Sequence, residues 1–388
     1  CRSPVFRPWL ISCRTLNATM ADAPTGHDAA LAGLRTKIDA VDRELLDLLN
    51  RRACLAQEVG EIKKHQGSLV FRPEREAKVI AGLKSVNPGP LHSDNIAPIW
   101  REIMSACRSL ETPTRVAYLG PAGTFSEQAT LGFFGSSIVR LPCSSIDEVF
   151  RVTSAGAADF GVVPVENSTE GGVARTLDLL LSTPLFIVAE TSLFVRHNLL
   201  RAQTDMADIE AVCAHPQALA QCQGWLAQHL PHAERRPVAS NAEGARLAAQ
   251  NPRLAAIASD RASSEYGLHI VAPAIQDDAH NRTRFAVLTQ PELHPSPRSS
   301  GNDCTSLVVS VSNRPGALHD LVLPLKNHGV SMTRFESRPA RSGGQWEYYF
   351  YIDLQGHPDD PKLTAALNEL RANCAFFKVL GNYPLDTH

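Results

Sequence analysis

Apolar residues between Leu31 and His65 recur at alternating steps of three and four, at positions 34, 38, 41, 45, 48, 55, 59 and 62. This spacing keeps them on one side of a helix, so it predicts a long helix with a heptad seam. The single gap in the seam is filled by Arg52, and Lys63 lies only about 20° from it around the helix axis. Both cations are therefore predicted to point inward and meet an anion. The alternative is that they flank the seam and extend their charged ends into water.

Two shorter helices are predicted next, one beginning after Pro73 and one running from Ser93 to Glu111, so residues 28–111 form an all-helical unit. Arg35 lies roughly 100° around the first helix from Arg52, which is too far to serve the same pocket. We therefore expect Arg35 to complete the pocket of a second copy, in a homodimer or a higher homo-oligomer.

Residues 115–290 alternate between short apolar runs and helical stretches, a pattern typical of a mainly parallel sheet covered by helices. Polar residues cluster where four of the predicted strands end, at Thr124 to Ser126, Glu166 to Thr169, His215 and Ser240. Thr124 and Ser240 each precede a glutamate by three residues, which is the spacing of a capping box. Because helix N-termini at strand ends attract anions, we expect one crevice that binds carboxylates.

A stretch rich in proline, serine and glycine at residues 291–303 separates this unit from the last one. Residues 303–388 then alternate in the order strand, helix, strand, strand, helix, strand, at Thr305–Val311, Ala317–Asn327, Val330–Glu336, Trp346–Leu354, Lys362–Asn373 and Phe376–Leu380. This order predicts a ferredoxin-like βαββαβ fold. Gly316, in the turn before the first of these helices, would let backbone amides approach a carboxylate closely.

The composition of the chain excludes some classes of protein and argues against others. The chain has 388 residues, with 38 basic and 40 acidic side chains, a net charge of −2 and 44% hydrophobic residues. These values exclude wholesale disorder and argue against a non-specific nucleic-acid binder or a polybasic membrane-surface protein. The most apolar stretch, residues 177–195, is broken by polar residues, so no membrane span is expected.

The cysteines indicate the compartment. Nine of them are scattered along the chain without a C-x-x-C pair, which favours a reducing cytoplasm over a disulfide framework or a zinc site. Residues 1–27 are expected to be a disordered tail or upstream sequence, and Met20 is a plausible start that would leave residues 1–19 upstream.

The helical unit carries a recognisable motif. L-R-x-K-I-D-x-x-D-x-x-L-L-x-L-L-x-x-R, followed by V-G-x-x-K and P-E-R-E, resembles the all-helical chorismate mutase family. The resemblance implies a cofactor-free rearrangement of chorismate, a dianion whose ether oxygen gains negative charge as its C–O bond breaks. It implies that Arg52, with Arg35 from a second copy, holds the carboxylates, and that Lys63 donates to the ether oxygen.

Three further mutase residues follow from the same resemblance. Arg75 would organise the site, and Glu76 would accept a hydrogen bond from the ring hydroxyl. Glu111 stands where some members have glutamine, so it could donate to the ether oxygen only when protonated.

The middle unit resembles a second family. G-P-x-G-T-F-S, G-V-V-P-V-E-N-S-T-E-G, H-P-Q-A-L and N-x-T-R-F-x-V-L are similar to prephenate dehydratases across residues 115–290. The resemblance implies two lobes like those of a periplasmic binding protein, with the chain crossing near residues 190 and 272 and the substrate in the cleft. The cleft residues that it implies are Thr124, Ser126, Asn167, Ser168, Thr169, His215, Ser240, Asn281, Thr283, Arg284 and Phe285.

Within this set, Thr283 is implied to hydrogen-bond or protonate the hydroxyl that leaves as CO2 is lost. A threonine hydroxyl is a weak acid, so His197 and His215 remain alternative proton donors. Both histidines are expected at turns, where an imidazole commonly caps the backbone.

In the last unit, R-P-G-A-L and E-S-R-P are similar to the ACT domains that follow prephenate dehydratases and bind phenylalanine. The resemblance implies that two sheets pair across a dimer and that the effector contacts Arg314, Gly316, Ala317, Leu318, Glu336, Ser337 and Arg338. The alternative is a module that only dimerises.

These features together predict a bifunctional enzyme without cofactor or metal, which converts chorismate through prephenate to phenylpyruvate under feedback inhibition by phenylalanine. Two alternatives remain. One is a non-enzymatic amino-acid sensor, because the middle unit shares its expected architecture with solute-binding proteins; such a sensor would not need Arg52 and Lys63 in a helix seam and, if secreted, should carry a signal peptide. The other is an arogenate dehydratase.

Overall fold

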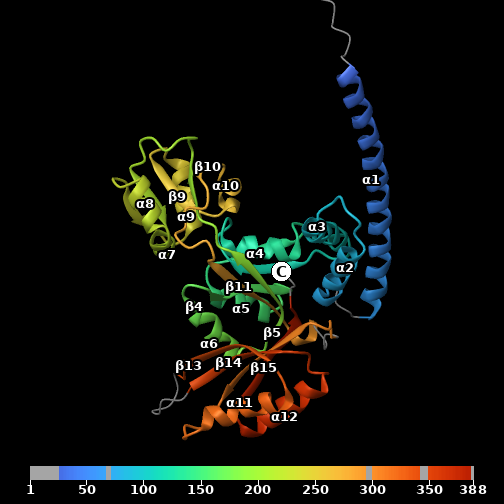
Figure 1. Cartoon of the computed structure of the whole chain (residues 1–388), viewed down its shortest axis with the longest axis vertical. Helices are drawn as coiled ribbons and strands as arrows, with labels where there is room; N and C mark the ends of the chain where they lie inside the picture. The colour runs from blue at the N-terminus through green and yellow to red at the C-terminus, as the bar shows by residue number, and fades with distance from the viewer. Residues whose placement is uncertain (1–25, 67–70, 294–298, 341–347, 386–388) are drawn as a thin grey trace, which may run out of the picture. The chain divides into compact units, whose positions relative to one another are not determined.

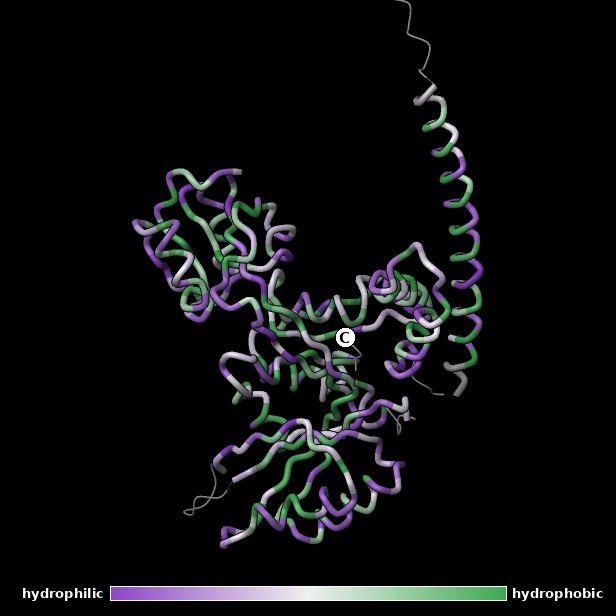
Figure 2. The backbone as a smooth tube through the Cα atoms, viewed as in Figure 1, coloured by the Kyte–Doolittle hydropathy of each residue, from purple (hydrophilic) through white to green (hydrophobic). Residues whose placement is uncertain are grey.

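The computed structural model describes residues 26–66, 71–293, 299–340 and 348–385, and it divides the chain into two compact units, residues 1–52 and 53–388. The boundary falls inside α1 (Gly26–Gln66), the long helix predicted from the heptad seam. Apolar positions recur along this helix (Figure 2), and the seam side chains of Leu34, Leu45 and Leu55 are 57%, 50% and 61% exposed.

Two further helices, α2 (Pro73–Ser85) and α3 (Ser93–Glu111), pack against each other, and α3 has the bounds that the sequence predicts. Pro73 occupies the first turn of α2, where its missing N–H has no partner to lose. Buried Ile96, Met104 and Cys107 form the inner side of α3. In the part of the chain that the structure describes, no helix is long and apolar enough to cross a membrane.

A ten-stranded sheet has the strand order β13-β14-β12-β15-β5-β11-β3-β1-β2, in which β4 pairs with β3, and the first lobe of the α/β region contributes the strands from β5 to β2 together with β4. Its elements are β1 (Arg115–Leu119), α4 (Phe125–Phe134), β2 (Val139–Cys143), α5 (Ile146–Ser154), β3 (Phe160–Asn167), β4 (Gly171–Gly172), α6 (Ala174–Ser182), β5 (Phe186–Phe194) and β11 (Arg282–Thr289).

The second lobe is a separate five-stranded sheet with the order β10-β6-β9-β7-β8 (Figure 1). Its elements are β6 (Asn198–Arg201), β7 (Ala211–Ala214), α7 (Pro216–Gln221), α8 (Gln223–His229), β8 (Glu234–Pro237), α9 (Asn241–Gln250), β9 (Leu254–Ala258), α10 (Asp260–Tyr266) and β10 (His269–Ala272). The chain enters this lobe after Phe194 and leaves it before Arg282.

The expectation of mainly parallel sheets is wrong, because both sheets are mixed. β1 pairs in parallel with β2 and β3, but β11 lies antiparallel between β3 and β5. The reason is the second crossing: the chain returns from the other lobe in the opposite direction and inserts β11 between two strands made earlier. This insertion brings residues near 283 beside residues near 167.

The last unit has the predicted βαββαβ order, with β12 (Asp303–Ser310), α11 (Ala317–His328), β13 (Met332–Pro339), β14 (Tyr348–Gln355), α12 (Pro361–Asn373) and β15 (Phe376–Pro384), and it follows a short 3-10 turn at Pro291–Leu293. Helices α11 and α12 cover one face of its sheet (Figure 1), and the other face packs on α6 and β5 of the first lobe. Gly381 touches the backbone of Ile187, and a Cβ at Gly381 would collide with that carbonyl oxygen. The two sheets therefore join edge to edge.

Candidate functional site

A hydrogen-bonded pair lies where β3 ends and β11 begins. Asn167 and Thr283 are register partners, and Asn167 Nδ2 donates to Thr283 Oγ1 at 2.9 Å and to Asn281 Oδ1 at 2.9 Å. Asn167 Oδ1 accepts from the backbone N–H of Thr169 at 3.0 Å. A backbone N–H can only donate, so this contact fixes the orientation of the Asn167 amide. Thr283 therefore accepts from Asn167 and keeps its own hydroxyl hydrogen free for a ligand.

This pair extends into a chain of donors that reaches the second lobe. The hydroxyl of Thr169 lies 2.5 Å from Asn167 Oδ1 and accepts from Gln221 Nε2 at 3.3 Å. Gln221 Oε1 lies 2.8 Å from His197 Nε2. Because an amide oxygen only accepts, His197 Nε2 carries the proton. Every bond then points the same way, from His197 toward Thr283, and such chains polarise each successive donor.

The same geometry bears on the two alternative proton donors. His197 is buried, and burial lowers its pKa, so the ring is neutral near pH 7 and its one N–H is already bonded to Gln221. His215 is exposed, and its Nδ1 accepts from the backbone N–H of Gln217 at 3.3 Å, as a helix cap. His215 thus caps α7 and His197 bonds the side chain of Gln221, whereas no contact among the described residues takes the hydroxyl hydrogen of Thr283.

Two of the four strand-to-helix junctions, at Thr124 and at Ser240, form the predicted capping boxes. Thr124 accepts from the N–H of Glu127 at 3.3 Å and donates to Leu119 O at 3.1 Å, so its hydroxyl is used by the backbone. Ser240 accepts from the N–H of Glu243 at 3.1 Å. Ser126, in the first turn of α4, is buried. The hydroxyls of Thr124 and Ser240 therefore serve as helix caps.

Glu127 links the loop at residues 120–124, between β1 and α4, to both lobes. It is fully buried and accepts from Gly123 N at 2.8 Å, Arg140 Nη1 at 2.6 Å and Arg261 Nε at 3.2 Å. Burial alone would raise its pKa, but the Gly123 amide and the two guanidinium groups lower it below the usual range. In return, Ser259 of the second lobe donates to Gly123 O at 3.0 Å, so the loop is held between the lobes.

A cavity of about 520 Å³ opens where the chain crosses between the lobes. Its lining includes Phe125 of the first lobe, Asp260 of the second, and the guanidinium groups of Arg196 and Arg282. The ring of Phe125 packs edge-on against that of His197, with centroids 5.5 Å apart. The guanidinium of Arg282 lies over the ring of Phe194, 4.3 Å from its centroid, so these two lining residues pack on each other.

Ser168 and Thr169 are both exposed beside Thr283. Ser168 Oγ accepts from the N–H of Arg282 at 2.9 Å. This bond continues the pairing of β3 with β11 by one residue. Five of the predicted cleft residues, Asn167, Ser168, Thr169, Asn281 and Thr283, are therefore brought together at one point.

Two predicted cleft residues lie elsewhere. Side chains alternate along a strand, so Arg284 points to the face opposite Thr283, where it pairs with Glu166, Glu190 and Asp353. A register shift follows it, and Phe285 is 1% exposed inside the hydrophobic core. The placement of Arg284 and Phe285 in the cleft is therefore corrected: one lies in an ion cluster and the other in the core.

The mutase residues are only partly placed. Arg35 and Arg52 belong to residues 1–52, and the side chain of Lys63 lies outside the described residues. Arg75 is exposed on α2. Glu111 packs on Gly60 so closely that a Cβ there would come within 2.8 Å of Glu111 Cγ. A mutase pocket formed by Arg35, Arg52, Lys63 and Arg75 stays a prediction.

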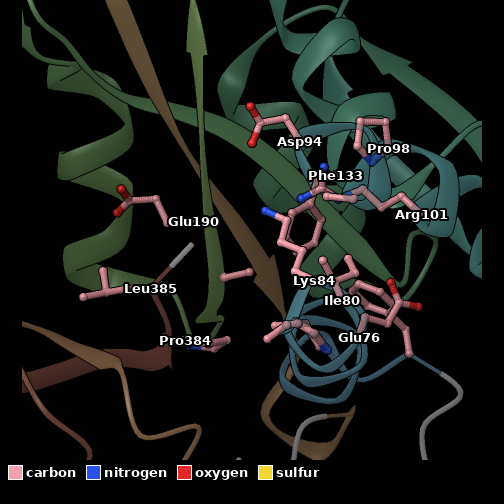
Figure 3. A pocket seen from close by; sticks show the side chains of 16 residues that line it. Glu76, Ile80, Lys84, Asp94, Pro98, Arg101, Phe133, Glu190, Pro384 and Leu385 are labelled. Carbon is pink, nitrogen blue, oxygen red and sulfur yellow. The ribbon is translucent and has the colours of Figure 1, made fainter. Parts of the chain in front are cut away.

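Glu76 has a partner that the sequence did not reveal. It is ion-paired with Arg108, which is buried on α3, donates to Phe134 O at 2.6 Å and lies over the ring of Phe71 at 4.4 Å. Figure 3 shows Glu76 at the wall of a cavity of about 490 Å³, with Lys84 and Arg101 among its other lining residues. Arg108 occupies a helix position where the periodicity alone suggests an apolar residue.

The predicted effector residues surround the first turn of α11 and the strand β13. Gly316 precedes α11 with φ +80°, a left-handed conformation that favours glycine, and Arg314 pairs with Asp320 at 2.7 Å. Ala317 is buried, whereas Leu318 and Ser337 are exposed.

The other two effector residues have partners inside the chain. Glu336 pairs with Arg334, and Arg338 contacts Asp178 of α6 at 3.3 Å. The first contact lies within β13, and the second links β13 to α6 of the first lobe.

Three family models match the chain: Chorismate mutase type II at residues 34–112, Prephenate dehydratase at residues 116–293 and ACT domain at residues 305–372. These matches define the class of protein, in which an isomerase, a lyase and a regulatory module share one chain. Their order and extents agree with the helical, two-lobed and ferredoxin-like regions of the fold.

A bifunctional chorismate mutase/prephenate dehydratase from Stutzerimonas stutzeri is 46% identical over 360 residues, which cover 91% of this chain and 97% of that protein. The chain therefore belongs to the family of bifunctional chorismate mutase/prephenate dehydratases. Membership of this family favours an enzyme over the non-enzymatic sensor.

Two solved structures resemble residues of the dehydratase and ACT regions. The prephenate dehydratase from Arthrobacter aurescens in complex with L-Phe is 34% identical with a TM-score of 0.64, covering 70% of this chain and 89% of that one. GqqA, described as a quorum quenching acylase, is 29% identical with a TM-score of 0.64, covering 70% of this chain and 98% of that one. The fold thus also occurs in a protein described by a different chemistry.

Proposed function

We propose that the chain rearranges chorismate to prephenate in residues 28–111 and converts prephenate to phenylpyruvate in residues 115–290, under feedback by phenylalanine bound to residues 303–388. The observation that carries the dehydratase step is that Thr283 Oγ1 accepts from Asn167 Nδ2 at 2.9 Å, which leaves the hydroxyl hydrogen of Thr283 to be donated to a ligand. A coupled assay tests the whole proposal: the purified chain is fed chorismate, and phenylpyruvate absorbance is followed.

In the dehydratase step, prephenate loses CO2, and the electron pair of that bond makes the ring aromatic as the ring C–O bond breaks. The departing hydroxide takes a proton and leaves as water. Thr283 donates a hydrogen bond to that oxygen, and donation from Asn167 into Thr283 Oγ1 strengthens it as a donor. Helix N-termini at the strand ends hold the two carboxylates. Feeding prephenate and arogenate separately distinguishes this reaction from that of an arogenate dehydratase.

In the mutase step, the ether C–O bond of chorismate breaks while a C–C bond forms, with no covalent intermediate. Arg52 and the Arg35 of a second copy hold the carboxylates, Lys63 donates to the ether oxygen, and Arg75 organises the site. Glu76 accepts from the ring hydroxyl while it is ion-paired with Arg108. Glu111 donates to the ether oxygen together with Lys63 only when its carboxyl group is protonated.

The bond from Gln221 to Thr169 gives a prediction about the dehydratase. Gln221→Met removes a donor that supports Asn167 and Thr283, so we expect dehydratase kcat to fall about tenfold, the worth of about one hydrogen bond. In Gln221→Glu, only the protonated carboxyl can donate to Thr169, so activity should fall as pH rises through the carboxyl pKa. Gln223→Met, on the exposed start of α8, is the control. An unchanged kcat for Gln221→Met would show that Thr283 works without this chain.

The exposed seam of α1 supports a homodimer or a higher homo-oligomer. Leu34, Leu45 and Leu55 are half or more exposed. Phe335 and Tyr348 of the ACT sheet are also exposed, at 37% and 40%. Two apolar surfaces at opposite ends of the sequence are therefore available for a second copy, and an isologous contact would use each of them twice.

Disrupting the seam should separate the subunits. A buried leucine contributes about 1.5–3 kcal/mol, and a symmetric contact loses it twice, so Leu45→Glu should weaken dimerisation about a hundredfold or more. We expect sedimentation to show smaller particles and mutase activity to drop, since Arg35 comes from the other copy. Arg43→Glu, on the same helix but outside the seam, should stay assembled. Equal sedimentation of both variants would place the interface elsewhere.

The free cysteines support a reducing compartment such as the cytoplasm. Among the described residues, Cys107, Cys143, Cys213, Cys222 and Cys304 are buried without forming disulfides. Disulfides persist mainly in oxidising compartments, so buried unpaired thiols are the pattern of a protein that works under reduction.

A further inference from the structure

A cluster of charges lies on the reverse face of the catalytic strand. Arg284 follows Thr283 in β11, and it donates to Glu190 Oε1 at 2.7 Å, to Glu166 Oε2 at 2.8 Å and to Asp353 Oδ2 at 3.1 Å. Glu166 and Glu190 belong to the dehydratase lobe, whereas Asp353 belongs to β14 of the ACT sheet. One guanidinium therefore joins the catalytic strand to the regulatory domain.

The ACT side of this contact is firmly held. Asp353 is 4% exposed and accepts from Ser306 Oγ at 2.6 Å. Ser306 Oγ lies 2.8 Å from the hydroxyl of Tyr383, which donates to Glu190 Oε2 at 3.2 Å. Burial raises the pKa of Tyr383, so this phenol stays a neutral donor. The ring of contacts closes back on Glu190, the bidentate partner of Arg284.

A second bridge runs in parallel. Arg334 of β13 contacts Glu166 Oε2 at 3.0 Å and pairs with Glu336, the first residue of E-S-R-P. The Glu336 carboxylate lies against Gly172 so closely that a Cβ there would collide with it. The motif implied to contact the effector is thus linked through one arginine to Glu166, the residue before Asn167.

We propose that Arg284 is a positioning residue that transmits the state of the ACT domain to Thr283, with Arg334 as the second link to Asn167. Successive residues of β3 and β11 point to opposite faces of the sheet, so Asn167 and Thr283 face the substrate, while Glu166 and Arg284 face the ACT sheet. Asp353 is buried, and a buried charge left without its partner is strongly disfavoured, so a movement of Asp353 favours a matching movement of Arg284. Arg334 is coupled in the same way to Glu166 through their ion pair. Effector binding then shifts the Asn167–Thr283 pair, which lies one residue away on each strand.

This inference rests on the proposed dehydratase function and on phenylalanine as the effector. The experiment uses the full-length chain with Asp353→Asn, Arg334→Lys and, as a matched control, Asp359→Asn, whose side chain is 81% exposed in the turn after β14. For each variant, dehydratase kcat, the phenylalanine concentration that halves it, and phenylalanine binding by calorimetry are measured. Mutase activity reports that the chain is folded.

We expect Asp353→Asn and Arg334→Lys to keep dehydratase kcat and phenylalanine affinity within about threefold of the parent chain. Half-inhibition of either variant should need at least about tenfold more phenylalanine, which is the scale of a typical allosteric coupling. Asp359→Asn should behave as the parent. Unchanged inhibition in either folded variant overturns the proposal, and so does loss of phenylalanine binding, which would put the residue in the effector pocket. A parent chain that phenylalanine does not inhibit would instead refute the feedback part of the proposed function.

Discussion

Thr283→Ala should remove nearly all dehydratase activity and leave the mutase reaction intact. Thr283 is the hydroxyl that Asn167 holds in place while leaving its hydrogen free, and no described side chain takes that hydrogen in the structure. A positioned proton donor contributes about 10²–10⁴ in rate, so we expect kcat for phenylpyruvate formation to fall by about that factor. The mutase reaction uses other residues and should serve as the internal measure of folding.

Thr283→Ser is the matched control for this loss. Serine keeps the hydroxyl and the bond from Asn167 but lacks the methyl group, so most of the activity should return. Near-normal phenylpyruvate production by a folded Thr283→Ala chain would reject the role of Thr283. Of the two alternative donors, His215 would then be tested first, because the single N–H of His197 is directed at Gln221.

Local signals in the sequence predicted the elements of the cleft well. The capping boxes at Thr124 and Ser240 fold as their spacing requires, because a side-chain oxygen and a backbone N–H three residues apart need no distant partner. The same holds for α3, whose bounds match the prediction, and for the βαββαβ order of the last unit. Such features are determined within a few residues of chain.

The residues that were predicted in the wrong place, Arg284 and Phe285, show which contacts a short sequence motif cannot predict. The T-R-F motif suggested that Thr283, Arg284 and Phe285 all contact the substrate. In a strand, however, Thr283 and Arg284 point to opposite faces. The ion pair of Arg284 with Asp353 of the ACT domain could not be predicted from the motif. Gln221 and Arg108 were missed for a related reason. Their partners Thr169 and Glu76 lie 52 and 32 residues away, and neither spacing nor periodicity encodes such a contact.

Arg52→Ala should have the reverse effect of Thr283→Ala. If Arg52 fills the gap in the apolar seam to hold a carboxylate of chorismate, its loss leaves that anion unpaired in a desolvated pocket and raises the mutase barrier by about 2–5 kcal/mol. Dehydratase activity on added prephenate should not change. Arg51→Ala, the exposed neighbour on the same helix, is the control. Mutase activity that survives Arg52→Ala would mean that Arg52 is a solvated residue flanking the seam.

A mixing experiment tests whether the mutase pocket is shared between two copies. Arg35→Ala and Arg52→Ala chains should each be inactive as mutases, since every site in either homodimer lacks one arginine. In a mixed dimer, the Arg52 of one copy meets the Arg35 of the other at one site, while the second site lacks both. Random exchange of equal amounts makes half of the dimers mixed, so about one quarter of the parent activity should return in a two-fold symmetric assembly. No recovery after confirmed subunit exchange would place Arg35 and Arg52 in the same site of one chain, or Arg35 outside the site altogether.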